Sequence, residues 1–259
     1  MNEPAPPATV RLVVPVHDEG AHLAAFLEAL VAAVPTAGAP ATSFVVVDDG
    51  SAPPAAAIQA EAVAAAAARL AGSPHAIALV MSPANLGKGA AIRLGWGNGD
   101  GAGWLGFVDG DGAVPAAEVW RLLGLVGEAA TFDALLATRL GPGRRHVRRA
   151  ALRDLQGRAF ALAADAVLGL GLHDPQCGLK LFRAARLAPL LPALEERRWL
   201  LDLELVLRLA GTGARLTEAP IDWMETSHSK LVAVIDPLRM LVGVVGLRRR
   251  LGPRREPAP

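Results

Sequence analysis

The sequence predicts an α/β fold, with a mostly parallel, Rossmann-like sheet flanked by helices. First, short apolar runs rich in β-branched residues alternate with longer alanine-rich segments over about the first 140 residues, which is typical of βαβ units. Second, the early apolar runs each end in a polar or glycine-bearing loop, as strands of an open α/β sheet do at their carboxyl ends. Third, 52% of the 259 residues are hydrophobic and 20% are charged, so the chain has enough apolar material for one large domain.

The individual elements follow from hydrophobic periodicity and from turn residues. Strands are expected at Val10–Val14, Phe44–Val47, Ala76–Val80, Trp104–Val108 and Ala134–Thr138. Helices are expected at Ala21–Val34, Pro54–Leu70, Gly89–Trp96, Pro115–Ala130, Leu152–Leu168 and Trp199–Ala210. The segment HDPQCGLKLFR is expected to lead from a loop into a strand or short helix. Pro220 marks an edge strand, because proline cannot donate to a sheet ladder.

The C-terminal part of the chain predicts an amphipathic helix over residues 231–250. Its apolar residues recur at helical spacing and Arg248–Arg250 follow, so it suits a membrane interface. The other interpretation is a helix that covers the sheet or a dimer interface. The main domain is expected over residues 9–230, with disorder at residues 1–8 and 251–259. No stretch reaches the roughly 18 apolar residues that a transmembrane helix needs.

The charge distribution and the composition limit the kinds of partner that the protein is expected to bind. The net charge is +1, but seven arginines lie between Arg139 and Arg158 and five between Arg248 and Arg255. Such clusters suit phosphates or an anionic membrane surface. Nucleic acid is not expected, because six Phe, five Trp and no Tyr offer few stacking platforms. The single cysteine, Cys177, excludes an internal disulfide, and the N-terminus is no signal peptide, so we expect a cytoplasmic protein, peripheral on the membrane.

Asp109 and Asp111 follow an expected strand in the sequence FVDGDGA. Two carboxylates at this spacing can hold one divalent cation that also bridges a diphosphate, and Gly110 lets the backbone approach the ligand. A surface turn is the alternative, because Asp-Gly pairs favour turns. A calcium loop is excluded, since Ala113 stands at its third ligand position.

Two further loops carry polar side chains. Asp48 and Asp49 end the strand in VVVDDGS, where a carboxylate can bind a base or ribose or can cap the next helix. Asn85 and Lys88 lie in the glycine loop NLGKG before a helix, which suits phosphate binding, although a lone lysine can equally be solvated. The loop is not a P-loop, and no Ser-His-Asp or Cys-His arrangement is found.

Taken together, VVPVHDEG, VVVDDGS, NLGKGAAIRLG and FVDGDGA, in this order, resemble the family 2 inverting glycosyltransferases of the GT-A fold. The later segments DPQCGLKLFR, RWLLDLELVLRLA, EAPIDWME and SHSKL look like those of the polyprenyl-phosphate sugar transferases, especially the dolichyl-phosphate glucosyltransferase branch. The resemblance covers about residues 9 to 245, and its specificity comes from the ordered set of motifs.

The resemblance implies a nucleotide-diphosphate sugar donor of the UDP-glucose or GDP-mannose type, Mg²⁺ or Mn²⁺, and a polyprenyl phosphate acceptor. The resemblance does not decide the oligomeric state, and a homo-oligomer is possible. The residues that match nucleotide, metal and diphosphate positions are Pro15, His17, Glu19, Asp48, Asp49, Lys88, Asp109, Gly110, Asp111, Ser229 and Lys230. Those that match acceptor-phosphate and sugar positions are Arg139, Arg148 or Arg149, Gln176 and Lys180. The sequence departs from the family pattern at three positions. Ala113 stands where mannosyl relatives carry a glutamine ligand, and the other two departures are Gly110 and His228.

A phosphate acceptor is already anionic at neutral pH, so the reaction needs no strong general base. Three alternatives remain open. A family 2 transferase with a hydroxyl acceptor would need a base, for which Asp174, Asp202 and Glu204 are candidates. A nucleotidyltransferase would release pyrophosphate instead of a nucleoside diphosphate. A catalytically silent binding module would recruit partners to a membrane.

Overall fold

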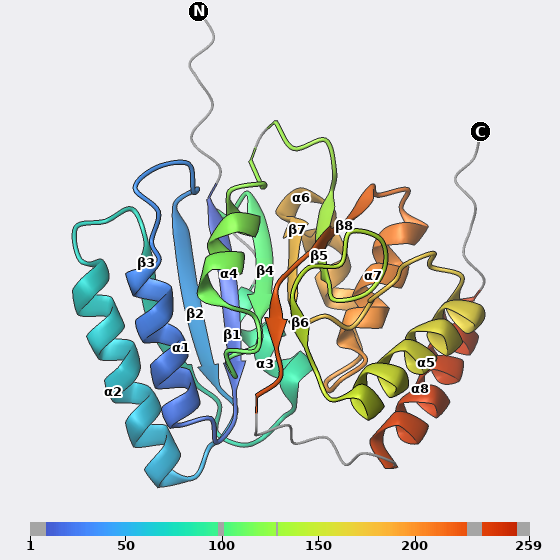
Figure 1. Ribbon diagram of the computed structural model, residues 1–259, viewed down its shortest axis with the longest axis horizontal. Coiled ribbons are helices and arrows are strands. Elements are labelled where there is room, and N and C mark those ends of the chain that lie inside the picture. The colour runs from blue at the N-terminus through green and yellow to red at the C-terminus, as the bar shows by residue number, and fades with distance from the viewer. Residues whose placement is uncertain (1–8, 98–100, 128, 227–234, 253–259) are drawn as a thin grey trace, which may run out of the picture.

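The computed structural model describes residues 9–97, 101–127, 129–226 and 235–252. Within them a seven-stranded sheet in the order β3-β2-β1-β4-β7-β5-β8 forms the centre (Figure 1). The strands are β1 Val10–Val16, β2 Thr42–Asp48, β3 Ala76–Met81, β4 Trp104–Val108, β5 Ala134–Thr138, β7 Leu179–Arg183 and β8 Leu216–Pro220. Only β7 runs antiparallel to its neighbours among these strands, so the predicted mostly parallel sheet is confirmed, with Pro220 on the edge strand.

The helices lie close to their expected positions. They are α1 Ala21–Ala32, α2 Pro53–Leu70, α3 Lys88–Trp96, α4 Ala116–Leu123, α5 Ala151–Leu168, α6 Ala184–Leu187, α7 Leu201–Gly211 and α8 Ile235–Leu251, with a 3₁₀ helix, η1, at Ala188–Ala193. The predicted extent of α4 to Ala130 is wrong. The helix ends at Leu123, and Gly124 caps it, since glycine is a poor helix former. No helix in the described ranges is long and apolar enough to cross a membrane.

The sheet carries a hydrophobic core on each face. Alternate side chains of β1, such as Leu12 and Val14, pack with α1, α2 and α4, whereas Val13 between them packs with α3 and α7 on the opposite face. This alternation follows from the two-residue period of a strand. The core on the α3 side also includes buried side chains of α5 and α8. Figure 1 shows α5 and α8 side by side at one end of the molecule.

The antiparallel strand β7 brings a distant loop to the carboxyl ends of the parallel strands. Its first residue, Leu179, pairs with Val108 at the end of β4, and the Asp109 N–H donates to the Gly178 carbonyl over 2.9 Å. The loop that precedes β7 therefore lies beside the loop that follows β4. A separate two-stranded sheet consists of β6 Val147–Arg148 and β9 Trp223–Met224, and the Met224 N–H donates to the Ala113 carbonyl, after β4, over 2.9 Å.

Candidate active site

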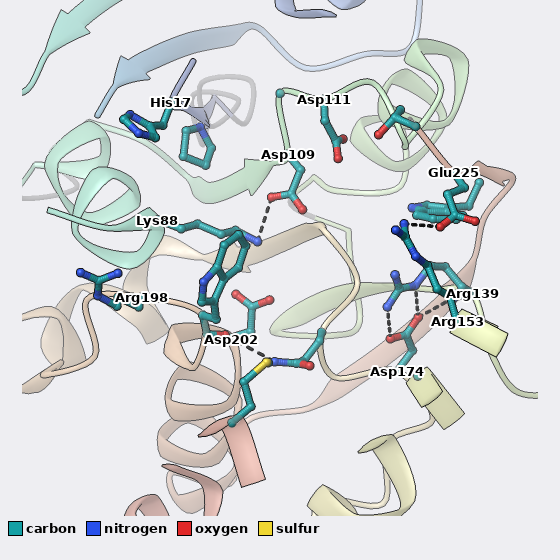
Figure 2. A pocket seen from close by; sticks show the side chains of 18 of the residues that line it. His17, Lys88, Asp109, Asp111, Arg139, Arg153, Asp174, Arg198, Asp202 and Glu225 are labelled. Atoms are coloured by element: carbon teal, nitrogen blue, oxygen red, sulfur yellow. Dashed lines mark hydrogen bonds and ion pairs between the residues drawn. The ribbon is translucent and has the colours of Figure 1, made fainter. Parts of the chain in front are cut away.

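A cavity of about 400 Å³ lies at the carboxyl ends of the parallel strands. Its lining comes from the segments that follow β1, β2, β3, β4 and β5, from the loop before β7, and from α5 and the segment before α7. Of the residues singled out in the sequence, it includes Pro15, His17, Glu19, Asp49, Lys88, Asp109, Gly110, Asp111, Arg139, Arg149 and Gln176. Figure 2 shows Asp109 and Asp111 with Lys88 and Arg198 to one side and Arg139 and Arg153 to the other.

Asp109 and Asp111 both line the cavity, and Asp109 is already paired with a lysine. Lys88 Nζ lies 2.8 Å from Asp109 Oδ1, and Asp111 Oδ1 accepts the Ala113 N–H over 3.0 Å. Burial and the neighbouring Asp109 carboxylate raise the pKa of Asp111 to about 6. The single charge of Lys88 therefore does not fully offset the two carboxylates.

The donor set fits a hard divalent cation. Hard carboxylate oxygens are the ligands that Mg²⁺ and Mn²⁺ prefer. Lys88 is paired with Oδ1 of Asp109, and Oδ2 is the second oxygen of that carboxylate that a cation could bind. In the part of the chain that the structure describes, no cluster of three or more His, Cys, Asp or Glu side chains could hold a metal alone. A Mg²⁺-type site commonly uses one or two carboxylates together with substrate phosphates, and Asp109 and Asp111 supply two carboxylates.

Gly178 sets the position of the Asp109 side chain. A Cβ atom on residue 178 would lie 2.3 Å from Asp109 Oδ2 and 2.7 Å from Cγ, far inside contact distance. Only glycine therefore leaves room for the carboxylate where it stands, above the loop that precedes β7.

Asp49 holds the glycine loop that presents Lys88. Its two carboxylate oxygens accept the N–H groups of Leu86 and Gly87 over 2.8 and 2.7 Å. Gly87 has a φ of 99°, in the left-handed region that glycine adopts without strain. Both oxygens of Asp49 are thus used in shaping the loop from which α3 and Lys88 begin.

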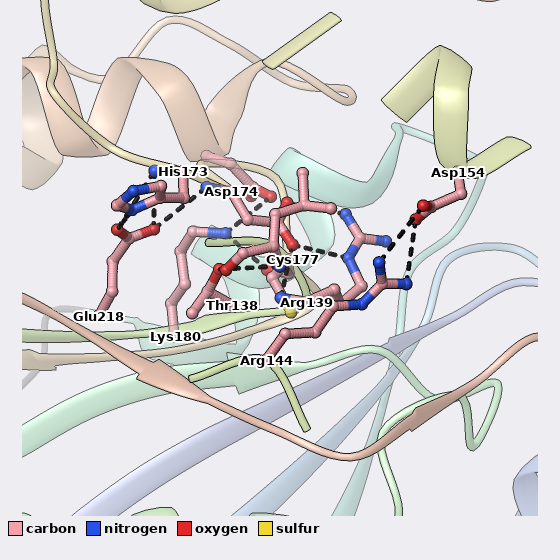
Figure 3. Close-up of polar contacts among 11 residues, drawn as sticks. Thr138, Arg139, Arg144, Asp154, His173, Asp174, Cys177, Lys180 and Glu218 are labelled. Carbon is pink, nitrogen blue, oxygen red and sulfur yellow. Dashed lines mark hydrogen bonds and ion pairs between the residues drawn. The ribbon is translucent and has the colours of Figure 1, made fainter. Parts of the chain in front are cut away.

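Arg139 and Asp174 form a buried two-point ion pair. Arg139 Nε and Nη2 lie 2.7 and 2.8 Å from the two Asp174 oxygens, and the Arg139 N–H donates to the same carboxylate (Figure 3). The guanidinium also lies 5.4 Å from the centre of the Trp223 ring. Burial opposes the charge of Asp174, but the Arg139 guanidinium lowers the pKa of that carboxyl below its ordinary value. Arg139 lines the cavity with its charge already neutralised.

Arg149 is different, because its charge has no such partner. Its Nε and Nη1 atoms are buried and make no hydrogen bond within the described residues. The guanidinium lies 5.7 Å from the Trp223 ring centre and packs against Gly157, where a Cβ would come within 2.5 Å of Nη1. Burial and the nearby Arg139 lower its pKa from the ordinary value. The sequence left Arg148 and Arg149 as alternatives; only Arg149 lines the cavity, and Arg148 is exposed on β6.

Lys180 lies beneath the cavity and does not line it. The side chain is fully buried, and its Nζ donates to the Cys177 carbonyl over 2.6 Å and lies 3.3 Å from Asp202 Oδ2. This corrects the expectation that Lys180 flanks the sugar, because the Lys180 side chain is enclosed in the interior and is not part of the cavity lining. Burial raises the pKa of the Cys177 thiol to about 12, which fits a packing residue.

The remaining expected residues divide into three groups. Pro15, His17 and Glu19 line the cavity from the segment at and after the end of β1. Asp48 is buried away from the cavity, and its Oδ1 accepts the Ser51 N–H over 2.9 Å, so the expectation that it binds a base or ribose needs correction. Ser229 and Lys230 lie outside the described residues, as do residues 1–8, 231–234 and 253–259.

Arg198 and Trp199 are among the side chains of the cavity wall that sequence reasoning missed. They lie just before α7, and Gln176 Nε2 donates to the Trp199 carbonyl over 3.4 Å. Buried Glu204 of α7 fixes this segment by accepting the N–H groups of Glu195 and Glu196. The sequence Arg-Arg-Trp at residues 197–199 indicates a binding site only weakly, because the position of these side chains relative to the cavity depends on the folded structure.

The described geometry can be compared with known proteins. Residues 12–187 match the model of glycosyl transferase family 2. Dolichyl-phosphate β-glucosyltransferase of Saccharomyces cerevisiae is 29% identical over 177 residues, which cover 63% of this chain and 52% of that protein. Undecaprenyl-phosphate mannosyltransferase of Micrococcus luteus is 31% identical over 179 residues, covering 64% and 72%. The chain spans about half the length of the yeast relative.

Two solved structures share the fold. A mannosyltransferase from Pyrobaculum calidifontis, in complex with GDP-Man and Mn²⁺, gives a TM-score of 0.60 at 17% identity and covers 99% of this chain and 67% of that chain. Glucosyl-3-phosphoglycerate synthase from Mycobacterium tuberculosis, in complex with phosphoglyceric acid, gives 0.61 at 15% identity, covering 96% and 82%. These likenesses confirm the fold expected from the sequence.

Proposed function

The chain belongs to glycosyl transferase family 2, and on this premise we propose that it transfers a hexose from a nucleotide-diphosphate sugar to a polyprenyl monophosphate, with inversion at the sugar. One observation carries the proposal. A single cavity holds an acidic pair with Lys88 and also a half-buried arginine, Arg149, whose buried Nε and Nη1 atoms have no hydrogen-bond partner in the described ranges. Such a cavity can hold a diphosphate and a second phosphate at the same time.

We assign the donor to the wall formed by Lys88, Asp109 and Asp111. The nucleotide would lie toward Pro15, His17 and Glu19, which line the cavity beside this wall. Asp109 and Asp111 would hold Mg²⁺ or Mn²⁺, which when bound neutralises the diphosphate. Lys88, released in part from Asp109, would donate to phosphate oxygens. UDP-glucose is the proposed donor, because the yeast relative is named a glucosyltransferase and Ala113 matches the glucosyl branch.

We assign the acceptor phosphate to Arg149. A phosphate would give the guanidinium the charge-assisted hydrogen bonds that it lacks in the described structure. Arg139 lies within reach of the same Trp223 ring, but Asp174 already occupies its fork. In the proposal Arg139 therefore packs against Trp223 and holds it in place, while Arg149 binds the phosphate directly.

The proposed step needs no proton transfer. An anionic oxygen of the polyprenyl phosphate forms a bond to the anomeric carbon, the bond from that carbon to the diphosphate oxygen breaks, and the nucleoside diphosphate leaves with the electron pair. The protein holds the two phosphates in line and stabilises the charge that moves to the leaving group. A general base is thus unnecessary.

A hydroxyl acceptor is the second candidate, and one observation favours it. Of the three carboxylates that could act as a base, Asp174 and Glu204 are engaged by arginines and backbone N–H groups, whereas Asp202 lines the cavity and is paired with Lys180. Asp202 could take a proton from a hydroxyl. Asp202→Asn distinguishes the two: it would abolish transfer to a hydroxyl and leave transfer to a phosphate largely intact.

A two-stage experiment tests the proposed function. Thermal shifts with UDP-glucose, GDP-mannose and related nucleotide sugars, each with and without Mn²⁺, identify the donor. Transfer is then measured with undecaprenyl or dolichyl phosphate and the donor that stabilises the protein, by analysis of lipid and nucleotide products. Release of pyrophosphate would instead indicate a nucleotidyltransferase. Metal-independent binding without donor turnover or hydrolysis would indicate a silent binding module.

A further inference from the structure

Helix α5 exposes an apolar face to solvent. Leu152, Leu155 and Leu162 are 65%, 65% and 73% exposed. All exposed residues of the helix are Ala151, Leu152, Leu155, Arg158, Ala159, Leu162 and Ala166. Their spacing of three, four and seven residues places them on one stripe along the helix. A surface helix normally turns its charged face toward solvent, whereas α5 turns a mostly apolar stripe toward solvent.

The neighbouring helix α8 shows the same feature. The two helices are in contact and lie side by side in Figure 1. On α8, Val242 is 72% and Val245 is 38% exposed, and the exposed Arg249 follows at the same helical spacing. We call the five side chains Leu152, Leu155, Leu162, Val242 and Val245 the α5–α8 face.

The opposite side of the same two helices forms a wall of the cavity. Arg153, Gln156, Gly157 and Phe160 of α5 line it, together with Met240 of α8. The helices therefore separate the reaction cavity from an apolar surface by the width of one helix layer. A substrate with an anionic head and an apolar tail could place its head inside while its tail leaves past these helices.

The charge around the face is positive. Arg158 lies on the stripe itself, Arg148 is exposed just before α5, and Arg249 is exposed on α8. The nearest acid on α5, Asp154, is engaged by Arg144 and Arg158. A two-fold contact with a second copy would bring these like charges together, which is unfavourable. Apolar side chains bordered by arginines match the surface of a bilayer with anionic head groups.

We infer that the α5–α8 face docks on an anionic lipid bilayer, and that the membrane thereby presents the acceptor to the wall of the cavity. The second clause rests on the proposed function, whereas the docking itself does not. The inference places the contact on α5, which the sequence pattern did not single out, as well as on the C-terminal helix.

Vesicle binding of matched variants tests the inference. In the triple variant Leu152→Gln, Leu155→Gln and Leu162→Gln the helix is preserved, because glutamine forms helices nearly as well as leucine. We expect wild-type protein to co-sediment with phosphatidylglycerol-containing vesicles more than with pure phosphatidylcholine, and binding of the triple variant to fall by about tenfold or more. Leu125→Gln, at an exposed leucine after α4, should bind as wild type does. Circular dichroism and thermal melts establish that the variants fold.

Three outcomes would overturn the inference. Wild-type protein could fail to bind the anionic vesicles at low salt, or the triple variant could bind them as wild type does. Wild-type protein could also be a dimer that the triple variant converts to a monomer, with neither binding vesicles, which would show that a second copy covers the face.

A water-soluble, short-chain prenyl phosphate separates this inference from the proposed function. We expect wild type and triple variant to turn it over equally, and only the long-chain acceptor in vesicles to reveal the difference. If neither protein transfers sugar to any prenyl phosphate but vesicle binding still depends on the three leucines, the proposed function fails and the docking surface stands.

Discussion

Lys88 Nζ lies 2.8 Å from Asp109 Oδ1, at the junction of the glycine loop and the acidic turn after β4. Burial alone would lower the pKa of Lys88, but the carboxylates of Asp109 and Asp202 raise it above its ordinary value, so the lysine is charged. In the proposed function, Lys88 binds the diphosphate and Asp109 binds the metal ion, so the pair links the two parts of the donor site.

Asp109→Asn should therefore affect both metal and donor. Loss of the carboxylate charge should lower kcat by about 10²- to 10³-fold and weaken Mn²⁺ binding, because the leaving diphosphate loses its neutralising ion. Initial rates at saturating donor and Mn²⁺ titrations by calorimetry provide the measurement. Glu61→Gln, at an exposed position on α2, is the control for removal of one acid. Near-normal turnover of Asp109→Asn would contradict the assignment.

Arg149 and Arg148 offer a matched pair of adjacent arginines. Arg149→Met should raise KM for the prenyl phosphate by about 10- to 100-fold, since charge-assisted hydrogen bonds are lost, and should leave KM for the donor unchanged. Arg148→Met, which removes an exposed arginine outside the cavity lining, should change neither value when the acceptor is the water-soluble, short-chain prenyl phosphate. Steady-state kinetics with each substrate varied in turn decide the matter. Equal effects of the two substitutions would indicate a general field of positive charge.

Asp174→Asn should destabilise the protein through Arg139. The substitution leaves a guanidinium, 13% exposed, without its neutralising partner, at a cost of about 3–5 kcal/mol in the free energy of unfolding. Urea denaturation measures this change. Asp222→Asn breaks the solvent-exposed pair with Arg145 and should have only a small effect. Similar stabilities of Asp174→Asn and wild type would show that the buried pair is not needed to hold the loop before β7.

These contacts show where sequence reasoning succeeded and where it could not. The strands β1 to β5 were predicted within a few residues, because each contains a short run of apolar residues. The placement of β7 between β4 and β5 depends on antiparallel pairing between distant segments, and no local pattern reports it. The Arg139–Asp174 pair spans 35 residues for the same reason. Arg148 and Arg149 are neighbours in the chain, and only the folded strand β6 and loop decide which one faces the cavity.

His75 should make stability depend on pH. Its ring packs 4.7 Å from Trp120, and its Nδ1 accepts the Thr42 N–H over 3.3 Å, so burial lowers its pKa from the ordinary value. The unfolded chain then binds the proton more readily than the folded protein. Stability should fall as the pH drops from about 7 to about 5, and His75→Gln should reduce this slope. Urea unfolding at several pH values measures it, and an unchanged slope in the variant would assign the dependence to other groups.

Gly178→Ala should inactivate the enzyme without unfolding it. The added methyl group would meet Asp109 at 2.3 Å from Oδ2, and the carboxylate, at the end of a short side chain, would have to turn away. We expect a thermal midpoint near that of wild type, weaker Mn²⁺ binding, and a loss of kcat of about 10²-fold, similar in kind to Asp109→Asn. Gly211→Ala, where an added Cβ meets nothing within 4 Å, is the control. Full Mn²⁺ affinity in Gly178→Ala would mean that the metal does not depend on this orientation of Asp109, because the steric clash leaves the carboxylate no way to keep it.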